Sequence, residues 1–202
     1  MVTARGGSSS QVWLTYVLTD FDVPKALTLY FSMKRVFTSR KLVVLVSRNV
    51  SPSMKEVVRS VFDFLFVLED ELNTAGLKNE EFVKLSAFTL KFFGKVVFLE
   101  PTMFAVKNSD DIFDNYEVSS GFLTTEVGQG DIDDGLSIFV ARPCLHVFRN
   151  LMNSLETRSV AGVESYLRIW ARNNLPPTAK PLDMKYSGKI SENPCALLRF
   201  DS

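Results

Sequence analysis

Glu100, Pro101 and Thr102 directly follow the apolar run Val96–Leu99, which has the length and composition of a buried strand. In open α/β sheets, ligands bind beyond the carboxyl ends of the strands. The carboxylate of Glu100 would stand at such an end, where it could bind a divalent cation. Thr102 offers only a neutral hydroxyl, and attraction to a divalent ion scales with ligand charge. The segment therefore supplies a single carboxylate for a metal.

Further acidic groups occur in the Gly-rich loop Gly128–Gly135, which contains Asp131, Asp133 and Asp134. The plain interpretation is a solvated loop. The functional interpretation is that one of these carboxylates helps Glu100 to hold a metal.

The chain has too few histidines and cysteines for most metal or disulfide chemistry. His146 is the only histidine, which excludes a zinc site built from several histidines. We expect it to be a surface or packing residue on a helix. Cys144 and Cys195 belong to no CxxC pair and are too few for a disulfide framework, so we expect ordinary thiols.

The composition is that of one folded domain with a balanced charge. The chain has 202 residues, of which 46% are apolar, and its 23 basic residues match its 23 acidic residues. This balance argues against nucleic acid as a partner and against an anionic membrane surface. No apolar run approaches the roughly 20 residues that span a bilayer, so we expect no membrane. Residues 1–11 begin with a Gly/Ser-rich stretch without a signal-peptide core, and we interpret them as a flexible lead-in. A cytoplasmic or nuclear location is the default expectation.

Strand and helix patterns alternate through the first half. Helices are predicted from Pro24, after Ser51 (where Ser53 and Glu56 have capping-box spacing) and from Phe82, the last with an apolar stripe that extends to Phe92. The order predicts an α/β fold with a mostly parallel, Rossmann-like sheet flanked by helices. The strands are predicted at Val12–Leu18, Leu42–Val46, Phe64–Leu68 and Val96–Leu99.

The second half is less regular. We predict strands at Gly121–Thr125 and Ser137–Ala141, a helix with an apolar stripe from Leu145 to Leu155, and another from Val163 to Trp170. The resulting domain is expected to span residues 12–174. Residues 175–202 are expected to form an extended or partly disordered tail, in which the apolar cluster Ala196–Phe200 could anchor a partner or pack back on the sheet; both interpretations stay open.

Several segments of the chain resemble a known family. KLVVLVSRNVSPSMKEVVRSVFD, residues 41–63, closely resembles the second strand and helix of glycogenin and its relatives, the retaining glycosyltransferases of family 8. LTYVLTDFDVPKAL, FVKLSAFTLKFFGKVVFLEPTMFAV, NSDDIFD and IFVARP extend the likeness. The resemblance covers roughly residues 12–173. It implies the GT-A fold of nucleotide-diphospho-sugar transferases, truncated at the C-terminus.

The resemblance also implies a site. Family members bind a UDP-sugar through a divalent metal, usually manganese, held by an Asp-x-Asp motif. Glu100 matches the first aspartate and Thr102 the second, so Glu100 is the vestigial metal ligand. Thr19, Asp20 and Phe21 match the nucleotide-binding turn, with one residue deleted. Lys84 matches a lysine near the nucleotide sugar, although a solvated helix lysine is the favoured interpretation.

Other family positions have changed as well. The sugar-contacting Asp-Gln-Gly becomes Val163, Glu164 and Ser165, and the family's final metal-binding histidine has no counterpart. These joint losses predict a degenerate member without a catalytic residue: an inactive pseudo-glycosyltransferase that acts as a protein-interaction scaffold. Its partner would be another protein, with the tail 175–202 as one candidate contact.

Two alternatives remain. The first is a divergent, metal-dependent UDP-sugar glycosyltransferase, and the second is a nucleotide- or sugar-binding module without turnover. No cofactor is expected under the main hypothesis; manganese and a UDP-sugar are expected only if the enzyme alternative holds.

Overall fold

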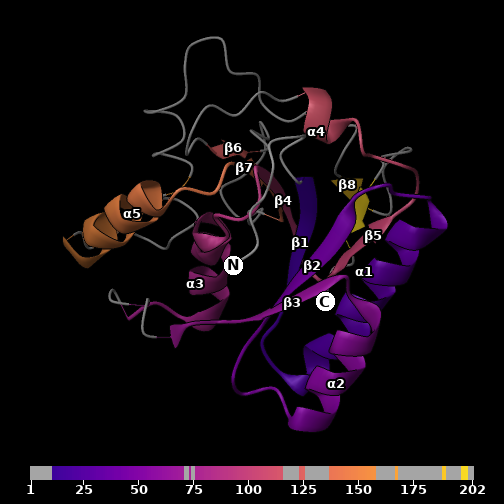
Figure 1. Ribbon diagram of the computed structural model, residues 1–202, viewed down its shortest axis with the longest axis horizontal. Coiled ribbons are helices and arrows are strands. Elements are labelled where there is room, and N and C mark those ends of the chain that lie inside the picture. Colours follow the sequence, from indigo (N-terminus) through magenta and orange to yellow (C-terminus); the bar gives the residue numbers. More distant parts are fainter. Residues whose placement is uncertain are drawn as a thin grey trace.

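The computed structural model describes residues 11–70, 73, 76–115, 123–125, 137–157, 167, 188–189 and 197–199. These residues form an α/β arrangement in which helices cover both faces of one central sheet (Figure 1). Within them, no helix combines the length and apolar character needed to cross a membrane. The strands are β1 Gln11–Val17, β2 Lys41–Val46, β3 Phe64–Val67, β4 Lys95–Leu99, β5 Met103–Ala105, β6 Leu123–Thr125, β7 Ile138–Ala141, β8 Gly188–Lys189 and β9 Leu197–Arg199. The helices are α1 Val23–Arg35, α2 Pro52–Val61, α3 Asn79–Ser86, α4 Ile112–Asn115 and α5 Leu145–Thr157, with 3₁₀ turns η1 Asp20–Asp22 and η3 Ala87–Thr89.

The central sheet has the strand order β3-β2-β1-β4-β7-β6. Its first four strands are parallel, which confirms the predicted mostly parallel sheet. β7 pairs antiparallel with β4, so that Phe98 lies opposite Phe139, and β6 pairs antiparallel with β7. The sequence predicted strands at the positions of β6 and β7, but their direction depends on how the intervening chain returns to the sheet.

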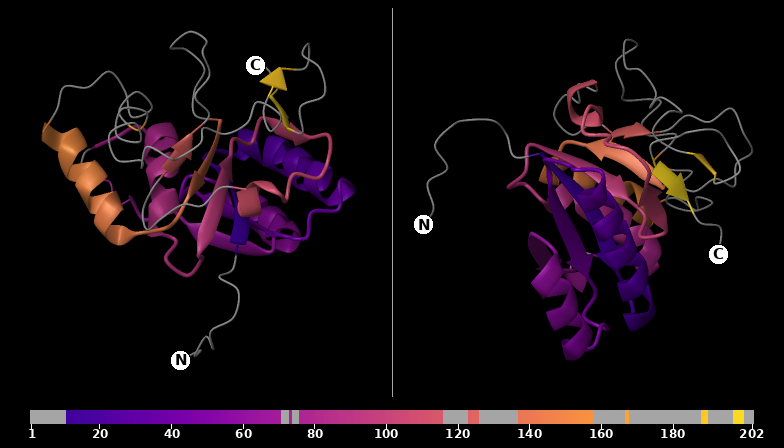
Figure 2. Two further views of the ribbon diagram at one scale, coloured as in Figure 1. Left: turned by 90° about the horizontal axis from the view of Figure 1, so that it is seen from above. Right: turned by 90° about the vertical axis from the view of Figure 1, so that its right-hand side faces the viewer.

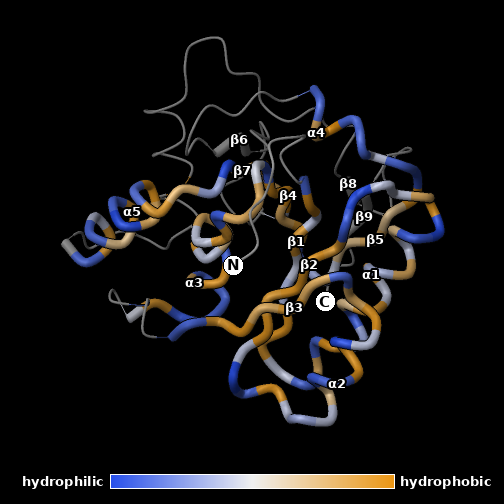
Figure 3. Tube along the Cα trace, viewed as in Figure 1, coloured by the Kyte–Doolittle hydropathy of each residue, from blue (hydrophilic) through white to orange (hydrophobic). Residues whose placement is uncertain are grey.

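Alternate residues of the central strands enter two separate cores. Val43 and Leu45 face the side covered by α3 and α5, whereas Leu42, Val44 and Val46 face the side covered by α1 and α2. A strand that is buried on both faces needs apolar residues at every position, which explains the continuous LVVLV run. Figure 3 shows the same concentration of apolar residues in the central strands.

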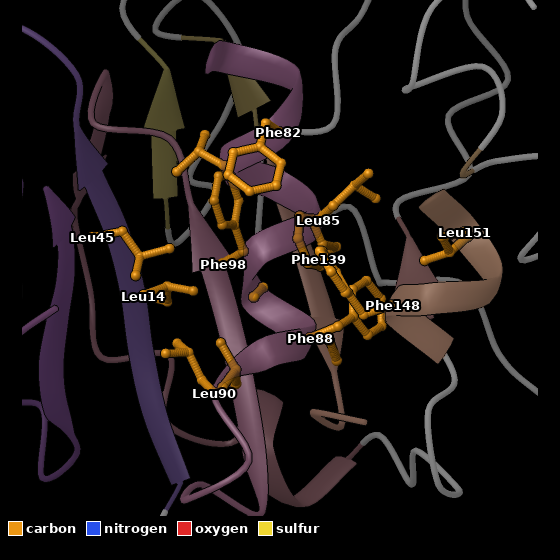
Figure 4. Packing of buried hydrophobic residues seen from close by; sticks show 14 of the residues in the cluster. Leu14, Leu45, Phe82, Leu85, Phe88, Leu90, Phe98, Phe139, Phe148 and Leu151 are labelled. Carbon is orange, nitrogen blue, oxygen red and sulfur yellow. The ribbon is translucent and has the colours of Figure 1, made fainter. Parts of the chain in front are cut away.

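The core beneath α3 is rich in aromatic rings (Figure 4). The rings of Phe98 on β4 and Phe139 on β7 stack with their centroids 4.7 Å apart, and Tyr16 on β1 stacks on Phe98 at 5.8 Å. Phe82, Leu85 and Phe88 are buried on the facing helix, as the predicted stripe required.

Two local predictions about the helices were wrong. The side chain of Ser51, not Ser53, caps α2 by accepting a hydrogen bond from the backbone N–H of Met54, because Pro52 already occupies the first helical turn. Phe92 does not continue the buried stripe of α3: its side chain is 73% exposed. The helix tightens to a 3₁₀ turn at Ala87 and ends, so the spacing of 3.6 residues per turn no longer applies.

A second, smaller sheet has the order β5-β9-β8. β9, which lies within the apolar cluster Ala196–Phe200, pairs antiparallel with β5, immediately beyond Pro101 and Thr102. The views in Figure 2 show β8 and β9 in yellow on the side of the molecule that carries α1. These five residues of the tail segment are therefore extended and joined to the small sheet.

The carboxylate of Asp110 ties the segment before α4 to the connection between α1 and β2. Its Oδ2 accepts hydrogen bonds from the backbone N–H and the hydroxyl of Ser39 at 2.6 and 2.7 Å, and its Oδ1 accepts from the hydroxyl of Thr38 and, at 3.4 Å, from Trp13 Nε1. Burial by itself would raise the pKa of Asp110, but these hydrogen bonds outweigh it and hold the pKa below its ordinary value.

Asp110→Asn is expected to lower the free energy of unfolding at pH 7 by about 1.5–3 kcal/mol, because the hydrogen bonds would no longer be made to a charged acceptor. A lowered native pKa stabilises the fold fully above the unfolded pKa of about 3.9, and this contribution disappears as the pH falls through the native pKa. Urea unfolding at pH 7 and pH 3 should therefore show the difference from wild type shrinking at the lower pH. Asp70→Asn, at an exposed carboxylate, is the control. An equal difference at both pH values would contradict the role of the charge.

Candidate functional site

Glu100 lies at the carboxyl end of β4, as predicted. Its backbone N–H donates to the carbonyl of Ser137 at 2.9 Å, and its own carbonyl accepts from the N–H of Met103 at 3.0 Å. Pro101 and Thr102 form the turn between these two residues, which leads directly into β5. The backbone of the segment is thus held on one side by the chain before β7 and closed on itself by a tight turn.

The carboxylate of Glu100 pairs with the ammonium of Lys84. Lys84 Nζ lies 3.0 Å from Glu100 Oε1, and the two residues are only 4% and 9% exposed. The interpretation of Lys84 as a solvated helix lysine was therefore wrong. The structure brings these two candidates of the site, one on α3 and one at the end of β4, into a single buried ion pair.

The surroundings of α3 explain why Lys84 is buried. Every residue of the helix from Phe82 to Ser86 is buried, so this turn has no face toward solvent. A helix that is enclosed all round lies in a core, and a lysine within it must meet an anion. Glu100 is that anion.

Thr102, the match to the family's second aspartate, contributes no charge. Its hydroxyl Oγ1 is buried and has no hydrogen-bond partner among the described residues. An unpaired buried hydroxyl is unusual, because its desolvation is not compensated. The residue that matches the family's second aspartate is thus a neutral group in a buried environment.

The turn after β1 holds the remaining candidates. Asp22 Oδ2 accepts hydrogen bonds from the backbone N–H and the hydroxyl of Thr19, at 2.9 and 3.0 Å. Asp20 Oδ1 accepts from the backbone N–H of Ser51 at 2.8 Å. Both carboxylates therefore stabilise local backbone, whereas the ring of Phe21 is 86% exposed.

These two groups of candidates share one edge of the sheet. β1 and β4 are adjacent and parallel, so the Thr19–Asp22 turn and Glu100 both follow the carboxyl ends of neighbouring strands. The carboxylates of the acidic loop and the segment Val163–Ser165 lie outside the described residues. His146 is exposed on α5, where its Nε2 lies 3.1 Å from Asn150 Nδ2.

The described residues do not fit a divalent cation. No three His, Cys, Asp or Glu side chains gather among them in a way that could hold a metal. The one carboxylate at the expected position already faces an ammonium 3.0 Å away. A cation bound to Glu100 would meet that positive charge in a buried environment, where repulsion is poorly screened.

The pairing of Lys84 with Glu100 was missed from the sequence. The residues are 16 positions apart, and nothing in that spacing links them. The available signal was the local context: Lys84 stands between Val83 and Leu85 in a helix for which an apolar stripe was already predicted.

Solved structures establish the class of the fold. The glycosyltransferase GlyE of Streptococcus pneumoniae TIGR4 superposes with a TM-score of 0.68 at 10% identity, covering 95% of this chain and 55% of GlyE. The galactosyltransferase LgtC, solved with donor and acceptor sugar analogues, gives a TM-score of 0.66 at 9% identity and covers 95% and 87%. The chain has the α/β fold of the GT-A glycosyltransferases.

Sequence comparison finds similarity to the glycogenins. Human glycogenin-2 is 29% identical over 182 residues, which are 83% of this chain and 36% of that protein. Mouse glycogenin-1 is 27% identical over 182 residues, or 83% of this chain and 54% of that protein. No family model matches the chain. The chain is thus similar in sequence to the glycogenins and spans between about a third and a half of the length of these relatives.

Proposed function

We propose that this chain is a glycogenin-like member of glycosyltransferase family 8 that no longer performs metal-dependent sugar transfer and serves as a protein-interaction scaffold. The observation that carries the proposal is the buried ion pair between Lys84 and Glu100. It gives the carboxylate that matches the first position of the family's metal-binding motif a counter-charge from within the fold.

The chemistry of the family makes this loss decisive. A hard cation held by several carboxylates would stabilise the charge that develops on a departing pyrophosphate. Here the first position is neutralised by Lys84, and the second is the hydroxyl of Thr102. Groups that act as a unit fail together, so the loss of one ligand removes most of the effect of the others.

The scaffold part of the proposal rests on what is kept. The described residues form two extensive hydrophobic cores, which supports a maintained fold. A domain that keeps its fold without catalysing a reaction must have another function. Binding to a partner protein is the simplest such function. Residues 175–202 remain the proposed contact, with Leu197–Arg199 already joined to β5.

The test is a pair of measurements on the purified chain, with glycogenin-1 as the active comparator. Isothermal titration with UDP and Mn²⁺ is expected to show no metal-dependent binding, and incubation with UDP-glucose and Mn²⁺ should release no UDP. Any trace release should be the same with and without Mn²⁺. Micromolar UDP binding that requires the metal, or UDP release that requires it, would instead establish the divergent enzyme, with Asp131, Asp133 or Asp134 as further ligands.

A second function is favoured by one observation. Phe21 is almost fully exposed at the carboxyl edge of the sheet, where a flat ring could stack on a nucleobase. A nucleotide-binding module without turnover would be stabilised by UDP in the absence of metal, because a ligand that binds only the folded state raises its stability. The melting temperature should then rise with UDP in wild type and not in Phe21→Ala. No shift in either protein would eliminate this function.

A further inference from the structure

A separate cavity of about 590 Å³ lies on the α3 and α5 side of the molecule. Its walls come from the end of β3, from the segment Ser86–Phe92 and from the first turns of α5. Neither Lys84 nor Glu100 lines it. The volume is within the usual range of about 300–1,000 Å³ for small-molecule sites.

The interior of the cavity is apolar. Leu68, Leu90, Phe148 and Met152 line it and are themselves buried, so they form fixed walls rather than mobile surface groups. Phe148 also packs edge-on against Phe82 of α3, at 6.5 Å between ring centroids, which anchors α5 against the helix beneath it. An apolar body of a ligand would find a preformed surface here.

The exposed rim of the cavity carries an imbalance of charge. Lys91 and Arg149 contribute two positive charges from two different elements, and Glu69 contributes one negative charge. Among the described side chains, neither cation has an ion-pair partner; Lys91 Nζ instead lies 5.9 Å from the ring centre of Phe92. Arginine and lysine are suited to bind a carboxylate, while Glu69 disfavours a second negative charge on the same ligand.

We propose that this cavity binds a small amphipathic monoanion, with an apolar body against the buried walls and one carboxylate at Arg149 and Lys91. The charge pattern selects this ligand over a neutral apolar molecule, a cation or a dicarboxylate. The proposal does not rest on the loss of sugar transfer, because it uses no residue of the Lys84–Glu100 site.

The test uses four probes of equal chain length on the full chain: decanoate, decanol, decyltrimethylammonium and decanedioate, each below its micelle concentration. Isothermal titration is expected to show one saturable decanoate site, with affinity at least tenfold higher than for the other three. Equal affinity for all four probes, or no saturable decanoate binding, would overturn the proposal.

Variants locate the site. The double variant Arg149→Gln/Lys91→Gln should weaken decanoate binding at least tenfold and leave decanol binding unchanged. Leu145→Trp, at a half-buried position of the cavity lining, should weaken both. Arg59→Gln, on exposed α2, is the matched control and should bind decanoate like the parent. If the double variant or Leu145→Trp retains full decanoate affinity, the binding lies elsewhere and the inference is wrong.

Discussion

Replacing Lys84 by Met is expected to lower the free energy of unfolding by about 3–5 kcal/mol, because it leaves the carboxylate of Glu100 buried without its counter-charge. Glu100→Gln should lower the free energy of unfolding by a similar amount, since it removes the negative charge that faces the buried ammonium of Lys84. Urea unfolding of each variant at pH 7 measures the effect. If the variants are too unstable to purify, their melting temperatures in cell extract can be compared with that of the wild type instead.

The double variant Lys84→Met/Glu100→Met separates an ion pair from two independent contacts. Removing both charges together removes both members of the pair, so the double loss of unfolding free energy should be smaller than the sum of the single losses. Lys25→Met is the control, because Lys25 pairs with Asp22 at 3.6 Å on the surface and should lose only about 0.2–1 kcal/mol. Additive single effects would contradict the buried pair, and with it the main support for the proposed function.

Phe98→Ala is expected to lower the free energy of unfolding by about 3–5 kcal/mol, through lost apolar burial and the cavity left behind. The ring of Phe98 is fully buried between Tyr16 and Phe139, so three neighbouring strands lose contacts at once. Chemical unfolding followed by far-ultraviolet circular dichroism provides the measurement.

Two substitutions make this prediction specific. Phe98→Leu retains most of the buried volume and should lose clearly less than Phe98→Ala. Phe21→Ala removes the same side chain from an exposed position and should stay within about 0.5 kcal/mol of wild type. Similar losses for Phe98→Ala and Phe21→Ala would show that the aromatic stack is not part of the cooperative core.

The sequence by itself determined the class of the fold. β1, β2 and β4 could be located to within a residue or so, because a strand buried on both faces is rich in apolar residues, and such a run is a local property. The short connections then indicated parallel pairing. The segment 41–63 and its neighbours indicated the similarity to the glycogenins. Glu100 was correctly placed at the end of β4 for the same reason.

Only the tertiary structure decided what the candidate site contains. Whether Lys84 meets water or an anion depends on which surfaces enclose α3, and those surfaces come from distant parts of the chain. Likewise, Phe92 lies outside the core because the helix ends early, and Leu197–Arg199 pairs with β5 because the fold brings the two segments together. Local patterns report how a segment buries its own apolar residues. A polar side chain acquires its role from its neighbours in space, and the neighbours of Lys84 and Glu100 include each other.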